Sequence, residues 1–318
     1  MNAARPFDGR VIAITGAGNG LGKAYAELLA GLGAKVVVNN RLRADAGAVS
    51  SAQEAAQAIR AQGGEAVADH SDISTEAGAQ ALAQCALDTW GRIDGLICNA
   101  GFTRDKTFMK MAMDDFRAVM EVHLMGTVYC CRAVLPAMVE QKFGRIVCCI
   151  SSAGLHGNFG QTNYAAAKAG VIGFMRSLNL EVSRHGVLAN ALAPFGATRM
   201  TSGGSMSRDP SPRYEPDRAA PAAAYLVSGQ CSFGGEIITA AAGYFGSAAM
   251  MEGEGIRLPA TDAAPTLADV AAQMDAIRKL DAARQFGNAM QSADWILRGK
   301  LPPAAQAGPA VQAEGAAA

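Results

Sequence analysis

Tyr164 and Lys168 are the residues whose types and spacing most directly suggest catalysis. They are four positions apart, so a helix would place both side chains on one face. A phenol with a reference pKa of roughly 10 carries protons poorly at pH 7, and a neighbouring ammonium lowers that pKa. Ser151 follows an apolar run, residues 145–150, that is typical of a buried strand. Together these residues predict a group that holds a carbonyl oxygen and exchanges a proton with it.

A glycine-rich segment near the start of the chain predicts a dinucleotide site. It reads Thr15-Gly16-Ala17-Gly18-Asn19-Gly20-Leu21-Gly22 and lies between a predicted strand and a predicted helix. Glycines permit a sharp turn and a close approach of backbone N–H groups to a pyrophosphate, whose charge the helix N-terminus favours. A structural turn without a ligand is the alternative. We expect the pyrophosphate of NADP or NAD to be bound by Gly16, Asn19, Gly20, Leu21 and Gly22.

The end of the second predicted strand indicates which nucleotide is preferred. An acid there would accept a hydrogen bond from the ribose 2′-hydroxyl, whereas an arginine would accommodate a 2′-phosphate. This chain has Asn39-Asn40-Arg41, with Arg43 close behind and no acid before Asp45. Asn40 and Arg41 therefore favour NADP over NAD. Alternatively, Arg41 begins a solvated loop.

Short apolar runs that alternate with helical segments must position these residues. The runs are residues 11–15, 35–39, 66–69, 95–98, 145–150, 187–193 and 234–239, and the helical segments are residues 21–32, 51–62, 77–90, 114–141 and 163–184. This rhythm predicts an α/β fold, a Rossmann-type doubly wound parallel sheet of about seven strands flanked by helices. We expect one catalytic domain over residues 1–245, with a substrate lid near 195–221.

The remainder of the chain predicts a helical extension over residues 246–300 and a disordered, low-complexity tail over 301–318. Thr266 and Asp269 have the spacing of a helix cap. The same spacing rules predict a buried stripe on that helix, made of Leu267, Val270, Met274 and Ile277.

Four motifs, in this order and spacing, resemble the classical short-chain dehydrogenases/reductases. They are Thr15-Gly16-x-x-x-Gly20-x-Gly22, Asn99-Ala100-Gly101, Ser151 and Tyr164-x-x-x-Lys168, and the resemblance covers about residues 8–245. It implies an oxidoreductase in which Tyr164 is the acid/base, Lys168 also binds the nicotinamide ribose and Ser151 orients the carbonyl. It further implies that Tyr164 and Lys168 contact the nucleotide together with Asp72, Ile73, Asn99, Ala100, Gly101, Pro194, Gly196, Ala197 and Thr198.

His123 stands where the resemblance implies an asparagine of the catalytic group. Val122-His123-Leu124, the segment from Gly157 to Tyr164 and Arg199-Met200-Thr201 resemble the (3R)-hydroxyacyl-CoA dehydrogenase part of the peroxisomal multifunctional enzyme type 2 group, which includes 17β-hydroxysteroid dehydrogenase type 4. Members of that group usually carry an acid at the position of Asn40 and are mostly NAD-linked. The resemblance implies that His123 holds a water beside Lys168, with a charge that could vary near neutral pH. A satisfied core histidine is the alternative.

An apolar wall is expected around the substrate, formed by Phe102, Leu155, His156, Phe159 and Met200. It suits a small-molecule substrate that is an acyl-CoA or steroid-like, and CoA phosphates could meet Arg104, Lys106, Arg199 and Arg208 unless these form a solvated face. The favoured reaction interconverts 3-hydroxyacyl-CoA and 3-oxoacyl-CoA. The alternatives are a hydroxysteroid (17β-type) or other bulky secondary-alcohol dehydrogenase, and a dinucleotide-binding regulator without turnover.

The amino-acid composition limits the kinds of partner expected for this chain. The 28 basic and 28 acidic residues balance without a long basic cluster, which argues against nucleic acid. Charges or breakers interrupt every long apolar run, so no membrane span is expected. The seven cysteines show no C-x-x-C spacing, which predicts no metal site and fits a reducing, cytoplasmic location. The family resemblance implies a homodimer or homotetramer through the helices predicted at 114–141 and 163–184.

Overall fold

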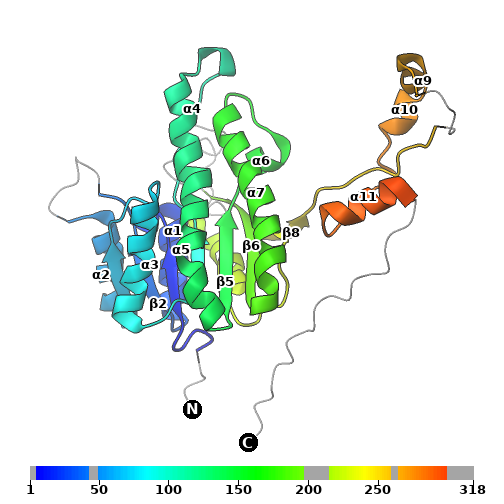
Figure 1. The fold of residues 1–318 in the computed structure, drawn as a ribbon. Helices are drawn as coiled ribbons and strands as arrows, with labels where there is room; N and C mark the ends of the chain where they lie inside the picture. The colour runs from blue at the N-terminus through cyan, green and yellow to red at the C-terminus, as the bar shows by residue number, and fades with distance from the viewer. Residues whose placement is uncertain (1–4, 43–48, 197–214, 259–263, 299–318) are drawn as a thin grey trace, which may run out of the picture. The chain divides into compact units, whose positions relative to one another are not determined.

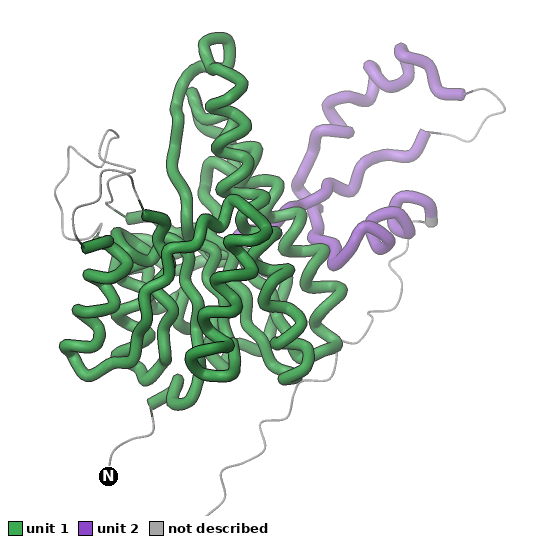
Figure 2. Tube along the Cα trace, turned by 60° about the vertical axis from the view of Figure 1, so that its left-hand side comes forward, with its two compact units in different colours: residues 1–247 green, residues 248–318 purple. Residues whose placement is uncertain are grey.

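A computed structural model describes residues 5–42, 49–196, 215–258 and 264–298. The chain divides into two compact units, residues 1–247 and 248–318 (Figure 2). The first unit contains the parallel sheet and its helices, and the second contains short helices. The predicted tail, 301–318, and most of the predicted lid lie outside the described residues.

The sheet has eight strands in the order β3-β2-β1-β4-β5-β6-β7-β8. Their bounds are β1 (Val11–Ile14), β2 (Lys35–Asn39), β3 (Glu65–Asp69), β4 (Gly95–Cys98), β5 (Gly144–Cys149), β6 (Val187–Phe195), β7 (Ile237–Ala241) and β8 (Tyr244–Ala248). Strands β1 to β7 pair in parallel, and the order reverses between β1 and β4, where such sheets open a crevice for ligands. The predicted doubly wound fold is confirmed.

An eighth strand adds to the predicted seven. Ala242 and Gly243 join β7 to β8 with φ values of 52° and 84°. Positive φ at both central residues is typical of a type I′ hairpin turn, so the chain reverses and adds β8 at the edge of the sheet. β8 therefore spans the predicted boundary at residue 245 between the catalytic domain and the extension.

Helices cover both faces of the sheet (Figure 1). One layer contains α1 (Gly20–Gly31), α2 (Ser51–Ala61) and α8 (Ala220–Val227); the other contains α3 (Glu76–Trp90), α5 (Gly126–Glu140) and α7 (Thr162–Val182). All four residues of β1 and all six of β5 are buried, as expected for strands covered on both faces. The core under the first layer includes Ile12, Val36 and Leu192.

Of the lid predicted near 195–221, the structure describes residues 195–196 and 215–221. Pro216–Arg218 forms a 3-10 turn (η6), and α8 begins at Ala220. Pro221 lies in the first turn of α8, where a proline is tolerated because the N–H it lacks would have no partner within the helix. Pro216 and Pro221 therefore lie at the starts of η6 and α8.

The long helix predicted at 114–141 contains a π-helical turn. It comprises α4 (Met113–Met120), the turn η2 (Glu121–Met125) and α5, and single π turns often occur at functional sites. By length and composition, residues Met113–Glu140 could also cross a membrane. Here the segment packs against α3 and α7, in the helical layer over the sheet.

In the second unit the capping box is confirmed, because the Thr266 and Asp269 side chains each accept a backbone N–H from the other. The predicted buried stripe is wrong: Leu267 is 87% exposed, and Val270, Met274 and Ile277 are 36–41% exposed. Gln273 interrupts the helix between α9 (Leu267–Ala272) and α10 (Met274–Ile277), so the four residues do not share one continuous face. The third helix of this unit is α11 (Ala289–Arg298).

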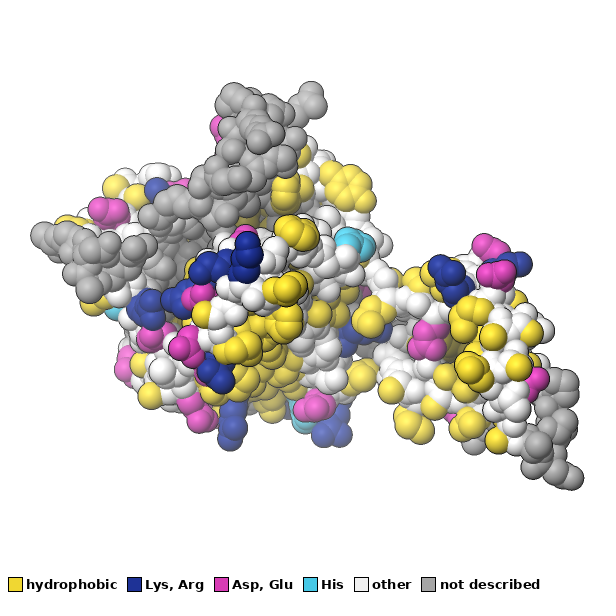
Figure 3. All heavy atoms as spheres, turned by 90° about the horizontal axis from the view of Figure 1, so that it is seen from above, with side chains coloured by type: hydrophobic (Ala, Val, Ile, Leu, Met, Phe, Trp, Pro, Cys, Tyr) yellow, Lys and Arg dark blue, Asp and Glu magenta, His cyan; other side chains and the backbone are white. Residues whose placement is uncertain are grey.

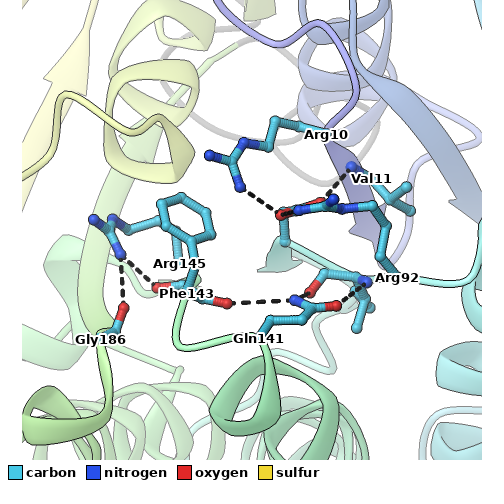
Figure 4. A network of polar contacts seen from close by, with 10 residues as sticks. Arg10, Val11, Arg92, Gln141, Phe143, Arg145 and Gly186 are labelled. Atoms are coloured by element: carbon cyan, nitrogen blue, oxygen red, sulfur yellow. Dashed lines mark hydrogen bonds and ion pairs between the residues drawn. The ribbon is translucent and has the colours of Figure 1, made fainter. Parts of the chain in front are cut away.

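A polar network ties the strands together at their amino ends, opposite the crevice (Figure 4). Asp94 accepts hydrogen bonds from the Val11 N–H at 3.0 Å, from Arg10 Nη1 at 2.7 Å and from Arg92 Nε and Nη2 at 2.8 and 2.7 Å. The Phe143 ring lies 4.0 Å from the Arg10 guanidinium and 4.4 Å from that of Arg145. Burial alone would raise the pKa of Asp94, but the hydrogen bonds from Arg92, Val11 and Arg10 outweigh burial and lower it.

We expect Asp94→Asn to lower the free energy of unfolding at pH 7 by about 3 kcal/mol, because two guanidiniums lose a buried carboxylate. The pKa of Asp94 is lower in the folded chain than in the unfolded one, so its contribution is present above about pH 4 and disappears as pH falls through the folded pKa. Urea unfolding at pH 7 and pH 3 measures both effects. An unchanged difference between the variant and the wild type at pH 3 would contradict this account.

Candidate active site

A cleft of about 1360 Å³ runs along the carboxyl ends of the strands, across the point where the strand order reverses. Figure 3 views the molecule from this side, and basic and apolar side chains lie next to one another on the surface. The predicted site residues that line the cleft are Gly16, Asn19, Gly20, Leu21, Asn40, Arg41, Asp72, Ile73, Asn99, Ala100, Gly101, Phe102, His123, Ser151, His156, Tyr164, Lys168, Pro194 and Gly196.

The remaining predicted residues either lie outside the described residues or are described but do not line the cleft. Ala197, Thr198, Met200, Arg199 and Arg208 lie outside the described residues, as do Arg43 and Asp45. Gly22 does not line the cleft; a Cβ there would lie 2.5 Å from the Gly16 carbonyl oxygen, so this glycine lets α1 pack against the turn below it. Leu155 is absent from the cleft wall, and Phe159 is 89% exposed.

The glycine-rich turn is held against the end of β4. Thr15 Oγ1 accepts from the N–H groups of Asn99 and Ala100 at 2.9 and 3.0 Å. A Cβ at Gly16 would lie 2.7 Å from the Ala100 Cα, so only glycine allows this approach. The Asn19 side chain makes no capping hydrogen bond to α1, which leaves the first N–H groups of the helix available to an anion. The turn therefore fits a dinucleotide pyrophosphate.

The adenosine end of the cleft is formed by residues after β2 and β3. Asn40 Nδ2 donates to Ser51 Oγ at 2.6 Å, and Arg41 Nη1 lies 3.0 Å from Asp72 Oδ2. Asn39 lies deeper and donates to Asp69 Oδ2 and to the Ser71 carbonyl. The segment after β2 thus presents an amide and a guanidinium to the cleft, with no carboxylate of its own among the described residues.

Ser151, Tyr164 and Lys168 meet at the other end of the cleft. Ser151 caps the short helix α6 (Ser152–His156) just beyond β5, and its hydroxyl hydrogen-bonds with Tyr164. Tyr164 and Lys168 lie one turn apart on α7, with Lys168 Nζ 5.8 Å from the centre of the phenol ring. A hydroxyl and a phenol at this position could both donate hydrogen bonds to one carbonyl oxygen.

The pKa of the Tyr164 phenol differs from the sequence prediction. Burial raises this pKa, and the hydrogen bond with Ser151 offsets only part of the increase. The expected lowering by Lys168 is wrong, because burial dominates the pKa of Tyr164. Lys168 Nζ donates to the Cys149 carbonyl at 2.6 Å, and burial lowers the pKa of the Lys168 ammonium. At neutral pH the phenol is therefore a proton donor.

His123 is 2% exposed on the π-helical turn and is held by the backbone of Phe102. Its Nε2 lies 2.7 Å from the Phe102 carbonyl oxygen, and its ring packs edge-on to Tyr164 with centroids 5.0 Å apart. Burial and then the charge of Lys168 lower its pKa to about 3. The expected variable charge near pH 7 is wrong: the imidazole is neutral. Nδ1 is buried and has no hydrogen-bond partner among the described residues.

Comparison with known proteins agrees with this geometry. The family model for short chain dehydrogenase matches residues 10–208. A short-chain type dehydrogenase/reductase of Mycobacterium tuberculosis is 41% identical over 281 residues, which cover 87% of this chain and 97% of that protein.

The chain belongs to the short chain dehydrogenase family.

Two further proteins within this family of oxidoreductases are similar to the chain. A 3-oxoacyl-[acyl-carrier-protein] reductase of Synechocystis sp. is 44% identical over 193 residues, which cover 60% of this chain and 76% of that one. The structure of full-length peroxisomal multifunctional enzyme type 2 from Drosophila melanogaster matches with a TM-score of 0.76 and 33% identity. The match covers 92% of this chain but 49% of that enzyme, so this dehydrogenase spans about half its length. The resemblance recognised from sequence is confirmed.

Asn163 was not among the predicted site residues. Asn163 is 0% exposed, its Oδ1 accepts from the Tyr164 N–H at 2.8 Å and its Nδ2 donates to the Arg104 carbonyl at 3.1 Å. It therefore fixes the start of α7 against the segment after β4. An asparagine immediately before Tyr164 at a predicted helix start was the available signal, because asparagine readily satisfies free N–H groups there.

We expect the His123 imidazole to remain neutral between pH 8 and about pH 5, because burial and Lys168 both disfavour its protonated form. Its folded pKa lies below the unfolded value near 6.5, so it lowers the stability of the fold as pH falls below that value. Ring ¹⁵N NMR spectra over this range, with His123→Asn to assign the signal, measure the charge. A titration of the assigned signal near pH 6.5 would show that the imidazole is not desolvated.

Proposed function

We propose that this chain is an NAD(P)-dependent oxidoreductase that interconverts 3-hydroxyacyl-CoA and 3-oxoacyl-CoA. The observation that carries the proposal is that one cleft joins the glycine-rich turn to Ser151, Tyr164 and Lys168. A dinucleotide that lies on the turn can extend along the strand ends to the catalytic group. When bound, it supplies or accepts the hydride.

NADP is the proposed nucleotide, with NAD as the alternative. Arg41 lines the cleft at the adenosine end, and Asn40 stands where an acid would otherwise repel a 2′-phosphate. The Asn40 amide does not repel that phosphate, and the Arg41 guanidinium attracts it. The sequence likeness to the multifunctional enzyme group favours NAD, so binding has to be measured with both nucleotides.

A thioester of a 3-oxoacyl chain is the proposed substrate class. One relative is named as a 3-oxoacyl-[acyl-carrier-protein] reductase, which supports a 3-oxoacyl group here. Phe102 lines the cleft beside the catalytic residues and offers an apolar surface to an acyl chain. Of the basic residues considered for CoA phosphates, Arg104 Nη1 pairs with Asp115 at 2.9 Å and Lys106 Nζ lies 3.9 Å from the same carboxylate, so Lys106 is the more available of the two.

The protonation states favour ketone reduction at neutral pH. The protonated phenol of Tyr164 donates a hydrogen bond to the ketone oxygen and then transfers its proton, while Ser151 holds the same oxygen as a second donor. Lys168, which is held by the Cys149 carbonyl, is proposed to bind the nicotinamide ribose, as the family resemblance implies. The buried Nδ1 of His123 can accept a hydrogen bond from a water beside Lys168, through which the proton is replaced.

The proposal includes an oligomeric state and a cellular location. We propose a homodimer or homotetramer that buries the outer surfaces of α4–α5 and α7, where Leu180 is 54% exposed. A cytoplasmic location is supported by seven free cysteines, six of them buried.

We expect acetoacetyl-CoA to be reduced with a kcat/KM at least about tenfold higher than a 17-ketosteroid, measured as loss of NADPH and NADH absorbance. Tyr164→Phe should cut turnover by about 10²-fold or more, because the proton donor is lost. Tyr225→Phe is the matched control, since Tyr225 lies on α8 and does not line the cleft. Preference for the steroid would select the hydroxysteroid alternative, and bound nucleotide without reduction of any ketone would select the regulator.

A further inference from the structure

Arg41 and Asp72 form an ion pair at the adenosine end of the cleft. Arg41 follows β2, Asp72 follows the neighbouring strand β3, and both residues line the cleft. The Nη1–Oδ2 distance is 3.0 Å. We propose that Asp72 sets the preference between NADP and NAD by competing with a 2′-phosphate for Arg41. This inference rests on the proposed nucleotide binding.

The two carboxylate oxygens of Asp72 have separate partners. Oδ1 accepts from the Ser74 N–H at 3.0 Å and from Ser74 Oγ at 2.6 Å, which fixes the turn before α3. Oδ2 faces Arg41. Burial alone would raise the pKa of Asp72, but the bonds from Ser74 and Arg41 lower it, so the group is charged at neutral pH. An asparagine could keep the Oδ1 contacts and replace only the oxygen that holds Arg41.

Among the described residues, few other groups at the adenosine end of the cleft can neutralise the charge of a 2′-phosphate. Among the described residues that line the cleft, the lysines and arginines are Arg41 and Lys168, and Lys168 is bound to the Cys149 carbonyl at the catalytic end. The Asn40 amide is already committed to Ser51. Within the described part of the chain, the Arg41 guanidinium is thus the cation placed to discriminate for or against a 2′-phosphate.

The pair acts differently on the two nucleotides. A 2′-phosphate has to draw Arg41 away from Asp72 and tolerate a nearby carboxylate, whereas the 2′-hydroxyl of NAD requires neither. Both side chains are partly exposed, at 62% and 39%, so the pair is weak enough to exchange partners. Asp72 thus reduces the advantage that Arg41 gives NADP and keeps NAD usable.

The test is a double-mutant cycle on nucleotide affinity. Kd values for NADP and NAD are measured by isothermal titration calorimetry for the wild type, Asp72→Asn, Arg41→Ala and the double variant. Asp72→Asn should raise the ratio of NADP to NAD affinity by roughly threefold to fivefold, the range expected from a partly exposed ion pair. Most of that gain should vanish when Arg41 is absent.

Ser74→Ala is the matched control, because it removes one bond to Oδ1 and leaves Oδ2 facing Arg41; the ratio should not change. A gain of equal size with and without Arg41 would show direct repulsion by Asp72 and overturn the competition. Equal effects of Asp72→Asn on both nucleotides would overturn it as well. If the wild type binds neither nucleotide, the proposed function itself fails, which distinguishes the two outcomes.

Discussion

The carboxyl ends of β1 and β4 are tied together by hydrogen bonds between Thr15 and the residues Asn99 and Ala100. The Thr15 hydroxyl accepts two N–H groups, and Asn99 Nδ2 returns bonds to the carbonyls of Thr15 and Gly16 at 3.1 and 3.3 Å. This tie lies where the strand order reverses, so it fixes the floor of the crevice from which both ends of the cleft extend. The nucleotide turn and the catalytic residues keep their spacing because both are built on the same rigid sheet.

At the other end of the cleft, burial sets the protonation of Tyr164 and His123, and the charge of Lys168 adds to the effect on His123. The Lys168 ammonium is 4% exposed and held by a backbone carbonyl, and its charge helps to keep His123 neutral. Burial keeps the Tyr164 phenol protonated at neutral pH. In the proposed reaction, a neutral imidazole, a protonated phenol and a buried ammonium form a set that suits proton donation to a ketone.

Local pattern was sufficient to predict most of the fold and the placement of Ser151, Tyr164 and Lys168 in one cleft. The strands of this sheet are short apolar runs, and the glycine turn and the Tyr164–Lys168 spacing depend on neighbours in sequence. Pairings between distant segments could not be predicted, such as Arg41 with Asp72 or Asn40 with Ser51, because they depend on how β2, β3 and α2 pack. The same limit explains the exposed Phe159 and the pKa directions, which are set by tertiary burial.

The central claim is that the cleft transfers a hydride from a nicotinamide nucleotide to a carbonyl carbon held by Ser151 and Tyr164. Mass spectrometry of the product formed from acetoacetyl-CoA and NADPH carrying two deuterium atoms at nicotinamide C4 tests this claim most directly. The account predicts a 3-hydroxybutyryl-CoA with one deuterium, bound to C3. A product without deuterium, or nucleotide that binds without forming any product, would contradict it.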